Sequence, residues 1–407
     1  MPLSVGSPSG RAATTCGYCS TSGERTATKS AAHAAGLFAS QLSCQVYQKM
    51  IDRGWRRSGT WCYKPDLKAS CCPSYTIKLD ALAFKPSKSQ RKLINRWNRF
   101  IIYGKQAEGK KSPSRNKNCQ TFSLSDAIHA SEVAFNSDEQ RAHVFEIVLE
   151  PAVYSPEKYE LYCNYQRDIH KDLKNTPSGY KRFLVESPLI PSPIPYATQS
   201  PSHFPPNYGS YHQLYRCDGK LIAMAVLDIL PNCVSSVYFM YDSQWERFSI
   251  GKLSALREVS LAAEMQAAGA PEMASLYMGF YIHSCPKMRY KGEYSPSYLV
   301  DPETYDWFPL GTCLPLLDKY RYACFSQPDH SIASDSGKQT PRFMYAPSDE
   351  VLSKVKVVSA IKDNHVSVIP VNKSSYWMLD EIRREIQGCV AGLGDALAME
   401  IVFYLDL

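Results

Sequence analysis

The sequence lacks an apolar run long enough to cross a lipid bilayer, which takes about 20 consecutive apolar residues. Its first fifteen residues are rich in Ser, Gly and Pro, and they also lack the apolar core of a secretory signal peptide. We therefore expect a cytoplasmic or nuclear protein with no membrane partner and a disordered tail over residues 1–15. In those compartments the 14 cysteines would be reduced rather than paired in disulfides.

Acidic residues are almost absent from residues 85–117. This segment holds eleven Lys and Arg residues against the single acid Glu108, whereas the whole chain of 407 residues carries a net charge of +7. Apolar residues at helical spacing predict a helix over 90–102, and residues 104–118 are expected to form a flexible loop. A run of charge is usually a solvated face, but such an excess also suits a nucleic acid backbone. The cations assigned to that partner are Lys88, Arg91, Lys92 and Arg96.

Cysteines occur in two close pairs near the N-terminus. Cys16 and Cys19 have the Cys-x-x-Cys spacing that lets two thiolates face one ion, and Cys71 directly precedes Cys72. Adjacent cysteines make a strained disulfide, so a metal explains both pairs better if they act together. We expect these four thiols to form an N-terminal metal-binding region. Ordinary buried thiols are the alternative, and His33 is a competing ligand.

Proline divides the chain. Seven prolines fall between residues 187 and 210, too many for regular structure, so this segment is predicted to be a linker. It would separate an N-terminal domain at 16–186 from a C-terminal domain at 211–407. The resulting molecule would be bilobed, with an α/β (α+β) fold.

The C-terminal domain begins with a recognisable order of elements. Residues 221–230 and 234–241 predict a β-hairpin, 252–268 a helix, and 275–283 a further strand. This is the core order of the GNAT acyltransferase fold, in which a helix N-terminus behind a loop holds an anionic group. The loop at 247–254 has one glycine, too few for a coenzyme A phosphate cradle, so we expect a GNAT-like core with another acyl donor.

Four long segments closely resemble the eukaryotic arginyl-tRNA-protein transferases, in the same order as in that family. They are YHQLYR (211–216), DGKLIA (218–223), DILPNCVSSVY (228–238) and MGFYIHSCPKMRYKG (278–292). The N-terminal half adds similar segments, CGYC (16–19), IDRGWRRSG (51–59) and CCP (71–73). The resemblance implies zinc or an iron-sulfur cluster at the cysteines Cys16, Cys19, Cys71 and Cys72.

The resemblance also implies a reaction. Arginine would pass from Arg-tRNA to the N-terminal amine of proteins beginning with Asp, Glu or oxidised Cys, and the products would enter the N-degron pathway of ubiquitin-dependent degradation. Contacts with tRNA are expected from the basic segment and from Arg53, Arg56 and Arg57. Two alternatives are a coenzyme-A-dependent N-acetyltransferase and a non-catalytic module that binds tRNA or zinc.

An aminoacyl-tRNA is an activated ester, so the enzyme's work is positioning, deprotonating the attacking amine and stabilising the oxyanion. Asp228 is the first candidate for binding the arginyl guanidinium or acting as base, although a turn-stabilising Asp is the alternative. His212 is another candidate base, with Tyr211 and Gln213 beside it in the sequence. Hydroxyl groups and cations for the acceptor carboxylate or the tRNA terminus are expected from Arg216, Tyr238, Tyr281, His283, Lys287, Arg289 and Lys291.

Overall fold

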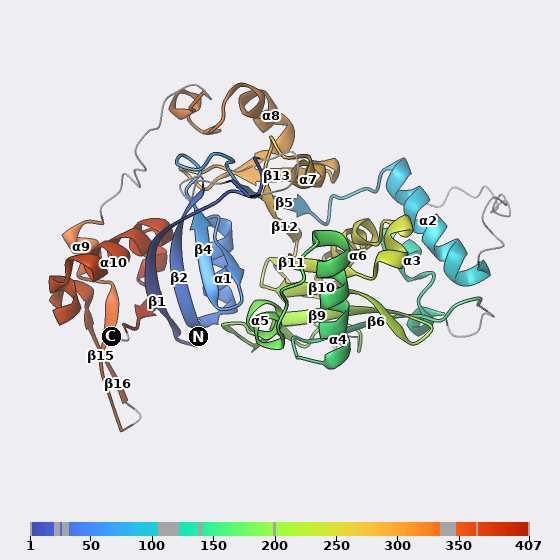
Figure 1. Cartoon of the computed structure of the whole chain (residues 1–407), viewed down its shortest axis with the longest axis horizontal. Coiled ribbons are helices and arrows are strands. Elements are labelled where there is room, and N and C mark those ends of the chain that lie inside the picture. Colours follow the sequence, from blue (N-terminus) through green and yellow to red (C-terminus); the bar gives the residue numbers. More distant parts are fainter. Residues whose placement is uncertain are drawn as a thin grey trace. The chain divides into compact units, whose positions relative to one another are not determined.

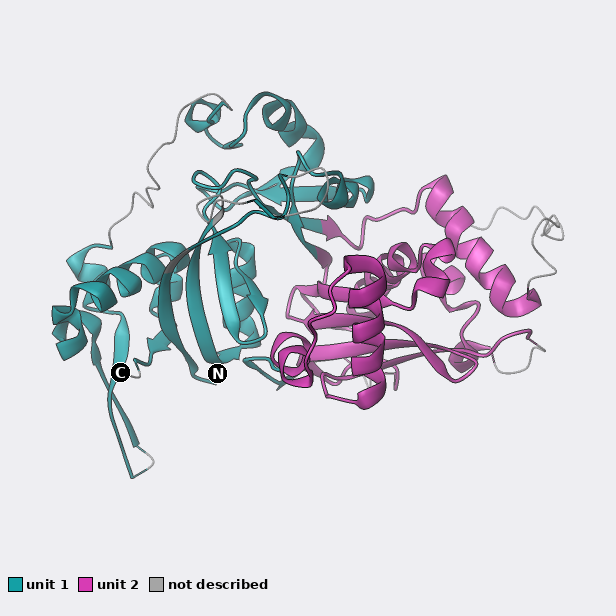
Figure 2. Cartoon of the chain, viewed as in Figure 1, with its two compact units in different colours: residues 1–78, 186–192, 278–407 teal, residues 79–185, 193–277 magenta. Residues whose placement is uncertain are grey.

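The computed structural model describes residues 2–19, 25–26, 32–104, 122–136, 141–197, 201–333, 347–363 and 365–405. It is a mixed α/β fold with two β-sheets (Figure 1). The chain divides into two compact units, coloured separately in Figure 2. Unit 1 comprises Met1–Lys78, Glu186–Ser192 and Met278–Leu407, and unit 2 comprises Leu79–Val185 and Pro193–Tyr277. Each unit thus takes segments from both predicted domains, 16–186 and 211–407.

A sheet of unit 1 has the strand order β16-β15-β17-β1-β2-β4-β3. Strand β17 runs parallel to both β1 and β15, and β2 pairs antiparallel with β1 and β4. The strands are β1 (Ser4–Thr14), β2 (Ala32–Ser43), β3 (Arg56–Ser58), β4 (Trp61–Pro65), β15 (Lys356–Lys362), β16 (His365–Pro370) and β17 (Ile401–Phe403). The short β7 (Leu189–Ile190) pairs with β2.

The expectation of a disordered tail does not hold for residues 4–14, which form β1. The segment has a composition typical of disordered chains, but two of its glycines are required by close packing. A Cβ atom at Gly6 would lie 2.9 Å from the carbonyl oxygen of Phe38, and one at Gly10 would lie 3.0 Å from Glu385. Gly10 also has a φ of +66°, in the left-handed region that favours glycine.

Helices α1 (Cys44–Asp52) and α10 (Asp380–Leu393) also belong to unit 1. The first begins at Ser43, whose Oγ accepts a hydrogen bond from the Val46 amide. The remaining elements of unit 1 are α7 (Pro286–Arg289), β13 (Ser297–Val300), β14 (Trp307–Pro309), α8 (Leu310–Lys319), α9 (Asp349–Leu352) and α11 (Asp395–Ala398). The division between the units falls within β5 (Tyr75–Asp80) and β12 (Ser275–Tyr281).

Unit 2 contains four antiparallel strands in the order β11-β10-β9-β6. They are β6 (Phe145–Pro151), β9 (Asn207–Cys217), β10 (Lys220–Ile229) and β11 (Cys233–Tyr241). After α6 (Ile250–Ala267) the chain returns as β12, which pairs parallel with β11 over only three residues, from Cys233 to Ser235. The predicted hairpin, helix and strand are therefore confirmed.

The basic helix is also confirmed, as α2 (Lys88–Tyr103). Ser87 and Gln90 form a capping box at its start, and Gly104 ends it with a φ of +69°. Trp97 on its apolar face packs edge-on against Phe145. The predicted flexible loop lies outside the described residues, apart from Gly104. The other helices of unit 2 are α3 (Leu124–His129), α4 (Pro156–Tyr165) and α5 (Pro177–Tyr180).

Short strands interrupt the proline-rich segment 187–210. They are β7 and β8 (Ser192–Pro193), and β9 begins at Asn207. Within the described parts of the chain, no helix is both long and apolar enough to cross a membrane.

Candidate functional site

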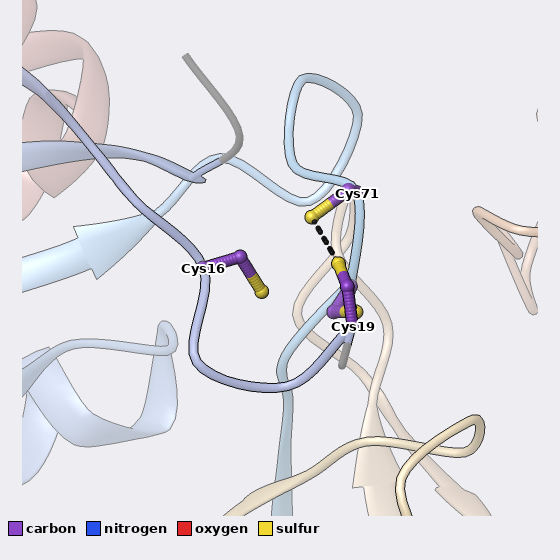
Figure 3. Close-up of side chains that lie close together, drawn as sticks. Cys16, Cys19 and Cys71 are labelled. Carbon is purple, nitrogen blue, oxygen red and sulfur yellow. Dashed lines mark hydrogen bonds between the residues drawn. The ribbon is translucent and has the colours of Figure 1, made fainter. Parts of the chain in front are cut away.

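Four cysteines of unit 1 bring their sulfur atoms together. Cys16 and Cys19 follow β1, and Cys71 and Cys72 follow β4. The Sγ atom of Cys19 lies 2.9 Å from that of Cys71 and 3.4 Å from that of Cys72, and all four sulfurs lie within 4.8 Å of one another. Figure 3 shows Cys16, Cys19 and Cys71. A compact set of four thiols fits a tetrahedral zinc ion or an iron-sulfur cluster. The structure therefore brings the two pairs together in one group, as predicted.

The pKa values of Cys16, Cys71 and Cys72 are shifted by the closeness and burial of these thiols. Burial, followed by the neighbouring Cys19 and Cys16, raises the pKa of Cys72 to about 12. Burial likewise raises the pKa of Cys71. For Cys16, burial opposes ionisation, but hydrogen bonds from the Tyr18 amide and the neighbouring thiols outweigh it and lower the pKa. Four thiolates this close repel one another, so a metal cation would replace the protons that otherwise hold the group together.

A cavity of about 500 Å³ adjoins the cysteines in unit 1. Cys16 and Cys72 form part of its wall. Its other lining residues are mainly aromatic or polar, and they include Tyr18, Arg25, His33, Trp61, Tyr63 and Phe280. The rings of Trp61 and Tyr63 stack with centroids 4.9 Å apart. His33, the competing ligand, thus lies on this cavity and not in the group of four sulfurs.

The segment 278–292 packs directly against two of the four cysteines, Cys16 and Cys72. Cys285 and Ile282 are buried together with Cys16 and Cys72, and Met288 packs on the same cluster. This places the longest family-like segment at the wall of the cysteine site.

Two cations lie beside Phe280, which lines the cavity. Lys291 Nζ donates to the Phe280 carbonyl at 2.7 Å, and Arg56 Nη2 donates to the Gly279 carbonyl at 3.2 Å. The Arg56 guanidinium lies 5.4 Å from the centroid of the Phe280 ring. Burial and then the charge of Arg56 lower the pKa of Lys291 to about 7. Lys291 was predicted from the sequence to bind substrate.

The other predicted substrate-binding residues of this segment lie close by. His283 connects two partners, since its Nδ1 lies 3.0 Å from the Tyr281 hydroxyl and its Nε2 lies 2.8 Å from Asp318. Lys287 and Arg289 are exposed on α7. The structure thus brings Tyr281, His283 and Lys291 together on one segment of unit 1.

The three arginines of the segment 51–59 occupy separate environments. Arg56 and Arg57 are each less than 10% exposed, and Arg57 Nη1 donates to the Gly59 carbonyl at 3.1 Å. The Arg53 guanidinium lies 3.8 Å from the centroid of the Tyr305 ring. They do not form one surface cluster of the kind expected for tRNA phosphates. On α2 of unit 2, by contrast, the predicted cations are exposed or partly exposed, namely Lys88, Arg91, Lys92 and Arg96.

The four predicted catalytic residues lie in the buried strands of unit 2. Asp228 and His212 are fully buried. Asp228 accepts a hydrogen bond from Ser210 Oγ at 2.7 Å, and His212 lies 2.9 Å from the Leu184 carbonyl and 3.1 Å from Lys158 Nζ. Tyr211 donates its hydroxyl hydrogen to the Asn207 carbonyl, and Gln213 donates to the Tyr215 hydroxyl. Such burial and bonding are typical of structural positions.

Two predicted substrate-binding residues of unit 2 also have protein partners. Arg216 forms an ion pair with Glu157, with Nη2 and Oε2 2.6 Å apart. The Tyr238 hydroxyl accepts a hydrogen bond from Gln166 Nε2 at 2.8 Å. Neither contact excludes a binding role, which stays a prediction.

Sequence reasoning missed one buried acid and the aromatic cavity wall. Glu258 on α6 accepts a hydrogen bond from Ser254 Oγ at 2.7 Å, and burial raises its pKa to about 7. Ser254 accepts in turn from the Tyr215 hydroxyl. The i, i+4 spacing of Ser254 and Glu258 on one helix face was the available signal. For the cavity wall, the aromatic residues Trp61 and Tyr63 alternate along β4.

Comparisons with known proteins identify the family. The model described as Arginine-tRNA-protein transferase, N terminus, matches residues 14–92, and the model for the C terminus of the same family matches residues 157–301. A protein from Drosophila melanogaster named arginyl-tRNA--protein transferase 1 is 33% identical, over 79% of this chain and 86% of that protein. The chain belongs to the arginyl-tRNA-protein transferase family.

Other relatives extend the comparison. An Arabidopsis thaliana protein with the same name is 29% identical, over 78% of this chain and 74% of that protein. A Stutzerimonas stutzeri (strain A1501) protein named aspartate/glutamate leucyltransferase is 27% identical, over 64% of this chain and 81% of that protein. The ranges that match the arginyl-tRNA-protein transferase models include the four cysteines and the segment 278–292.

Proposed function

We propose that this chain is an arginyltransferase that moves arginine from Arg-tRNA to the N-terminal amine of a protein. The observation that carries the proposal is the packing of the family-like segment 278–292 against the cysteine cluster, beside a cavity of about 500 Å³. The family to which the chain belongs is named for this reaction.

The chemistry is aminolysis of an activated ester. The acceptor amine loses a proton and attacks the arginyl carbonyl carbon, so a C–N bond forms. The C–O bond to the 3′-terminal ribose breaks, and the ribose oxygen takes a proton. No covalent enzyme intermediate is required, and the rate gain comes from positioning and charge stabilisation.

Acceptor selection is assigned to unit 1. The acidic side chain of the first acceptor residue would be bound by the cations Lys291 and Arg56 beside Phe280. The name of the bacterial relative, aspartate/glutamate leucyltransferase, supports acidic acceptors. The proposed acceptors begin with Asp, Glu or oxidised Cys, and the arginylated products would become substrates of the N-degron pathway. Lys287 and Arg289 are exposed cations that could assist.

The cysteines Cys16, Cys19, Cys71 and Cys72 would hold zinc or an iron-sulfur cluster, and no coenzyme A is expected. A metal bound there supplies a cross-link between the loops that follow β1 and β4. Because these thiols must be kept available, a reducing compartment suits the site, and we propose the cytoplasm or the nucleus.

The tRNA is assigned to unit 2, where α2 presents exposed cations. A GNAT-like core is proposed for the same unit. Support comes from the antiparallel order β9-β10-β11 followed by α6 and by β12, which is parallel to β11 for only three residues. Strands that separate after so short a pairing leave room for an acyl donor between them.

The test is a transfer assay with purified, metal-replete protein. Arg-tRNA is mixed with a peptide beginning in Asp or with the matched peptide beginning in Ala, and the products are weighed by mass spectrometry. Addition of one arginine to the Asp peptide alone is expected. Acetylation of either peptide with acetyl-CoA would support the N-acetyltransferase alternative. Binding of tRNA without any transfer would support a non-catalytic module.

A further inference from the structure

Unit 1 contains a second cavity, of about 430 Å³, that the proposed reaction does not use. It lies among the ends of β4 and β5, the turn at residues 300–305, and α10. Only Pro65 and Ser74 line both this cavity and the one beside the cysteines. Its volume is in the range of pockets that hold small molecules, about 300–1,000 Å³.

The cavity is built around two cations that converge on one tyrosine. Lys64 Nζ lies 2.7 Å from the Tyr305 hydroxyl, and the Arg53 guanidinium lies 3.8 Å from the centroid of the Tyr305 ring. Lys64 is 7% exposed, and its Nζ also donates a hydrogen bond to the Gly392 carbonyl at 3.0 Å. In the described parts of the chain, no carboxylate forms an ion pair with Arg53 or Lys64. Buried cations without an anion are unfavourable.

The acids that line this cavity are occupied elsewhere. Glu303 Oε1 lies 2.7 Å from Lys68 Nζ and 2.9 Å from the Tyr322 hydroxyl, and Oε2 lies 2.6 Å from His330. Asp66 Oδ1 accepts a hydrogen bond from the Ala69 amide at 3.1 Å. The cavity wall carries Arg53, Lys64 and Lys68 against two carboxylates. Burial lowers the pKa of Lys64, so the permanently charged Arg53 is the main source of positive charge without an ion-paired carboxylate in the described parts of the chain.

Within the described residues, two buried hydrogen-bonding atoms at the cavity have no partner. Thr76 is 1% exposed, and its Oγ1 is buried without a hydrogen bond. The Nε of Arg53 is buried in the same way. Both residues line the cavity. Buried polar groups are nearly always satisfied, so these two unpartnered atoms, one of them on a guanidinium without an ion-paired carboxylate, indicate a missing acceptor atom.

We propose that this cavity binds a small organic anion, whose carboxylate or phosphate group contacts Arg53 and Thr76 and whose apolar body lies against Tyr305. Burial raises the pKa of the Tyr305 phenol, but Lys64 and Arg53 outweigh it and lower the pKa overall, as a positive potential requires. A bound anion would complete the charge balance and satisfy the orphaned atoms. Binding to this cavity is measured directly, so its test does not depend on arginine transfer.

The test is isothermal titration calorimetry of the full, metal-replete chain with three probes. Benzoate and inorganic phosphate represent the two anionic groups, and benzamide is a neutral molecule of nearly the same shape as benzoate. Saturable binding of benzoate, phosphate or both is expected, with no binding of benzamide. Preference for one anion would assign the ligand to the carboxylates or to the phosphates.

Variants tie the binding to the cavity. Arg53→Met is expected to weaken binding at least roughly tenfold, the loss typical of a charged hydrogen bond. Thr76→Val is expected to weaken it roughly three- to tenfold without lowering the melting temperature of the ligand-free protein, because the hydroxyl is unpartnered there. Lys49→Met, which removes an exposed cation of α1, is the matched control and should bind normally.

Several results would overturn the proposal. They are an absence of saturable binding by both anions, equal binding of benzamide, or unchanged affinity in both Arg53→Met and Thr76→Val. If Arg53→Met does not fold, Arg53→Lys replaces it, and unchanged affinity in both Arg53→Lys and Thr76→Val would overturn the proposal.

Discussion

Lys291 allows a stability prediction with a defined sign. Burial and then the charge of Arg56 lower its pKa from 10.5 to about 7, so the folded state disfavours the proton that the unfolded state retains. Stability should therefore rise as the pH increases from about 7 to about 10.5. The full pKa shift corresponds to at most about 5 kcal/mol. Because Lys291 is partly exposed, we expect a rise of about 1–3 kcal/mol.

Lys291→Met removes the titrating group and should remove this rise. At pH 6–7 the variant is spared the penalty of a buried charge, although it loses the hydrogen bond to Phe280. Towards pH 10 the wild-type protein gains stability relative to the variant. Lys287→Met, which changes an exposed lysine of α7, is the control and should keep the wild-type pH dependence.

The assay is urea unfolding followed by tryptophan fluorescence between pH 6 and 9.5 at constant salt. The quantity compared is the difference in unfolding free energy between wild type and variant at each pH. A difference that stays constant across this range would refute the reasoning, because Lys291 would then have the same pKa in both states.

Three further predictions concern the metal, the buried acid of α6 and the tRNA. Cys71→Ser should lose most of the bound metal, while Cys163→Ser in unit 2 should retain it. The metal-to-protein ratio is measured by inductively coupled plasma mass spectrometry, and equal retention in both variants would contradict the four-thiol site. Burial raises the pKa of Glu258 from 4.5 to about 7, so the folded state loses stability as pH rises between these values. Glu258→Gln should therefore be about 1–3 kcal/mol more stable than wild type at pH 8 and little changed at pH 4.5, and equal differences at both pH values would contradict this. Reversing three cations of α2 to Glu should weaken tRNA binding at least roughly tenfold. It should also reduce the slope of log affinity against log salt concentration by about three, whereas Lys354→Glu should change neither quantity. The three cations are Arg91, Lys92 and Arg96, and unchanged affinity in the folded triple variant would rule out this surface.

Elements with a strong local signal could be predicted from the sequence. The hairpin of β10 and β11, helix α6 and helix α2 have clear periodicity and clear end signals, so they were located to within a few residues. Strand β1 could not be found in this way, because its Gly, Ser and Pro residues resemble a disordered tail. Its pairing with β17 joins residues almost 400 positions apart, and no local pattern encodes such a contact.

The candidate site was predicted unevenly for a similar reason. The spacing of the cysteines indicated the two pairs, Cys16 with Cys19 and Cys71 with Cys72. A shared metal was the reason to expect both pairs in one site, with ordinary buried thiols as the alternative. The role of Asp228 stays a prediction from a family-like segment. After Lys220 every residue of β10 is buried, which the sequence alone did not show. The cavity beside the cysteines depends on Tyr63 and Phe280, which are brought together only by the fold.

The most direct test of the central claim crosses two donors with two acceptors. Purified protein receives Arg-tRNA or Leu-tRNA together with a peptide beginning in Asp or in Ala, and each product is measured by mass spectrometry. Transfer of arginine to the Asp peptide is expected, with at most traces in the other three combinations. Equal transfer of leucine, equal modification of the Ala peptide, or no transfer by metal-replete protein that binds tRNA would contradict it.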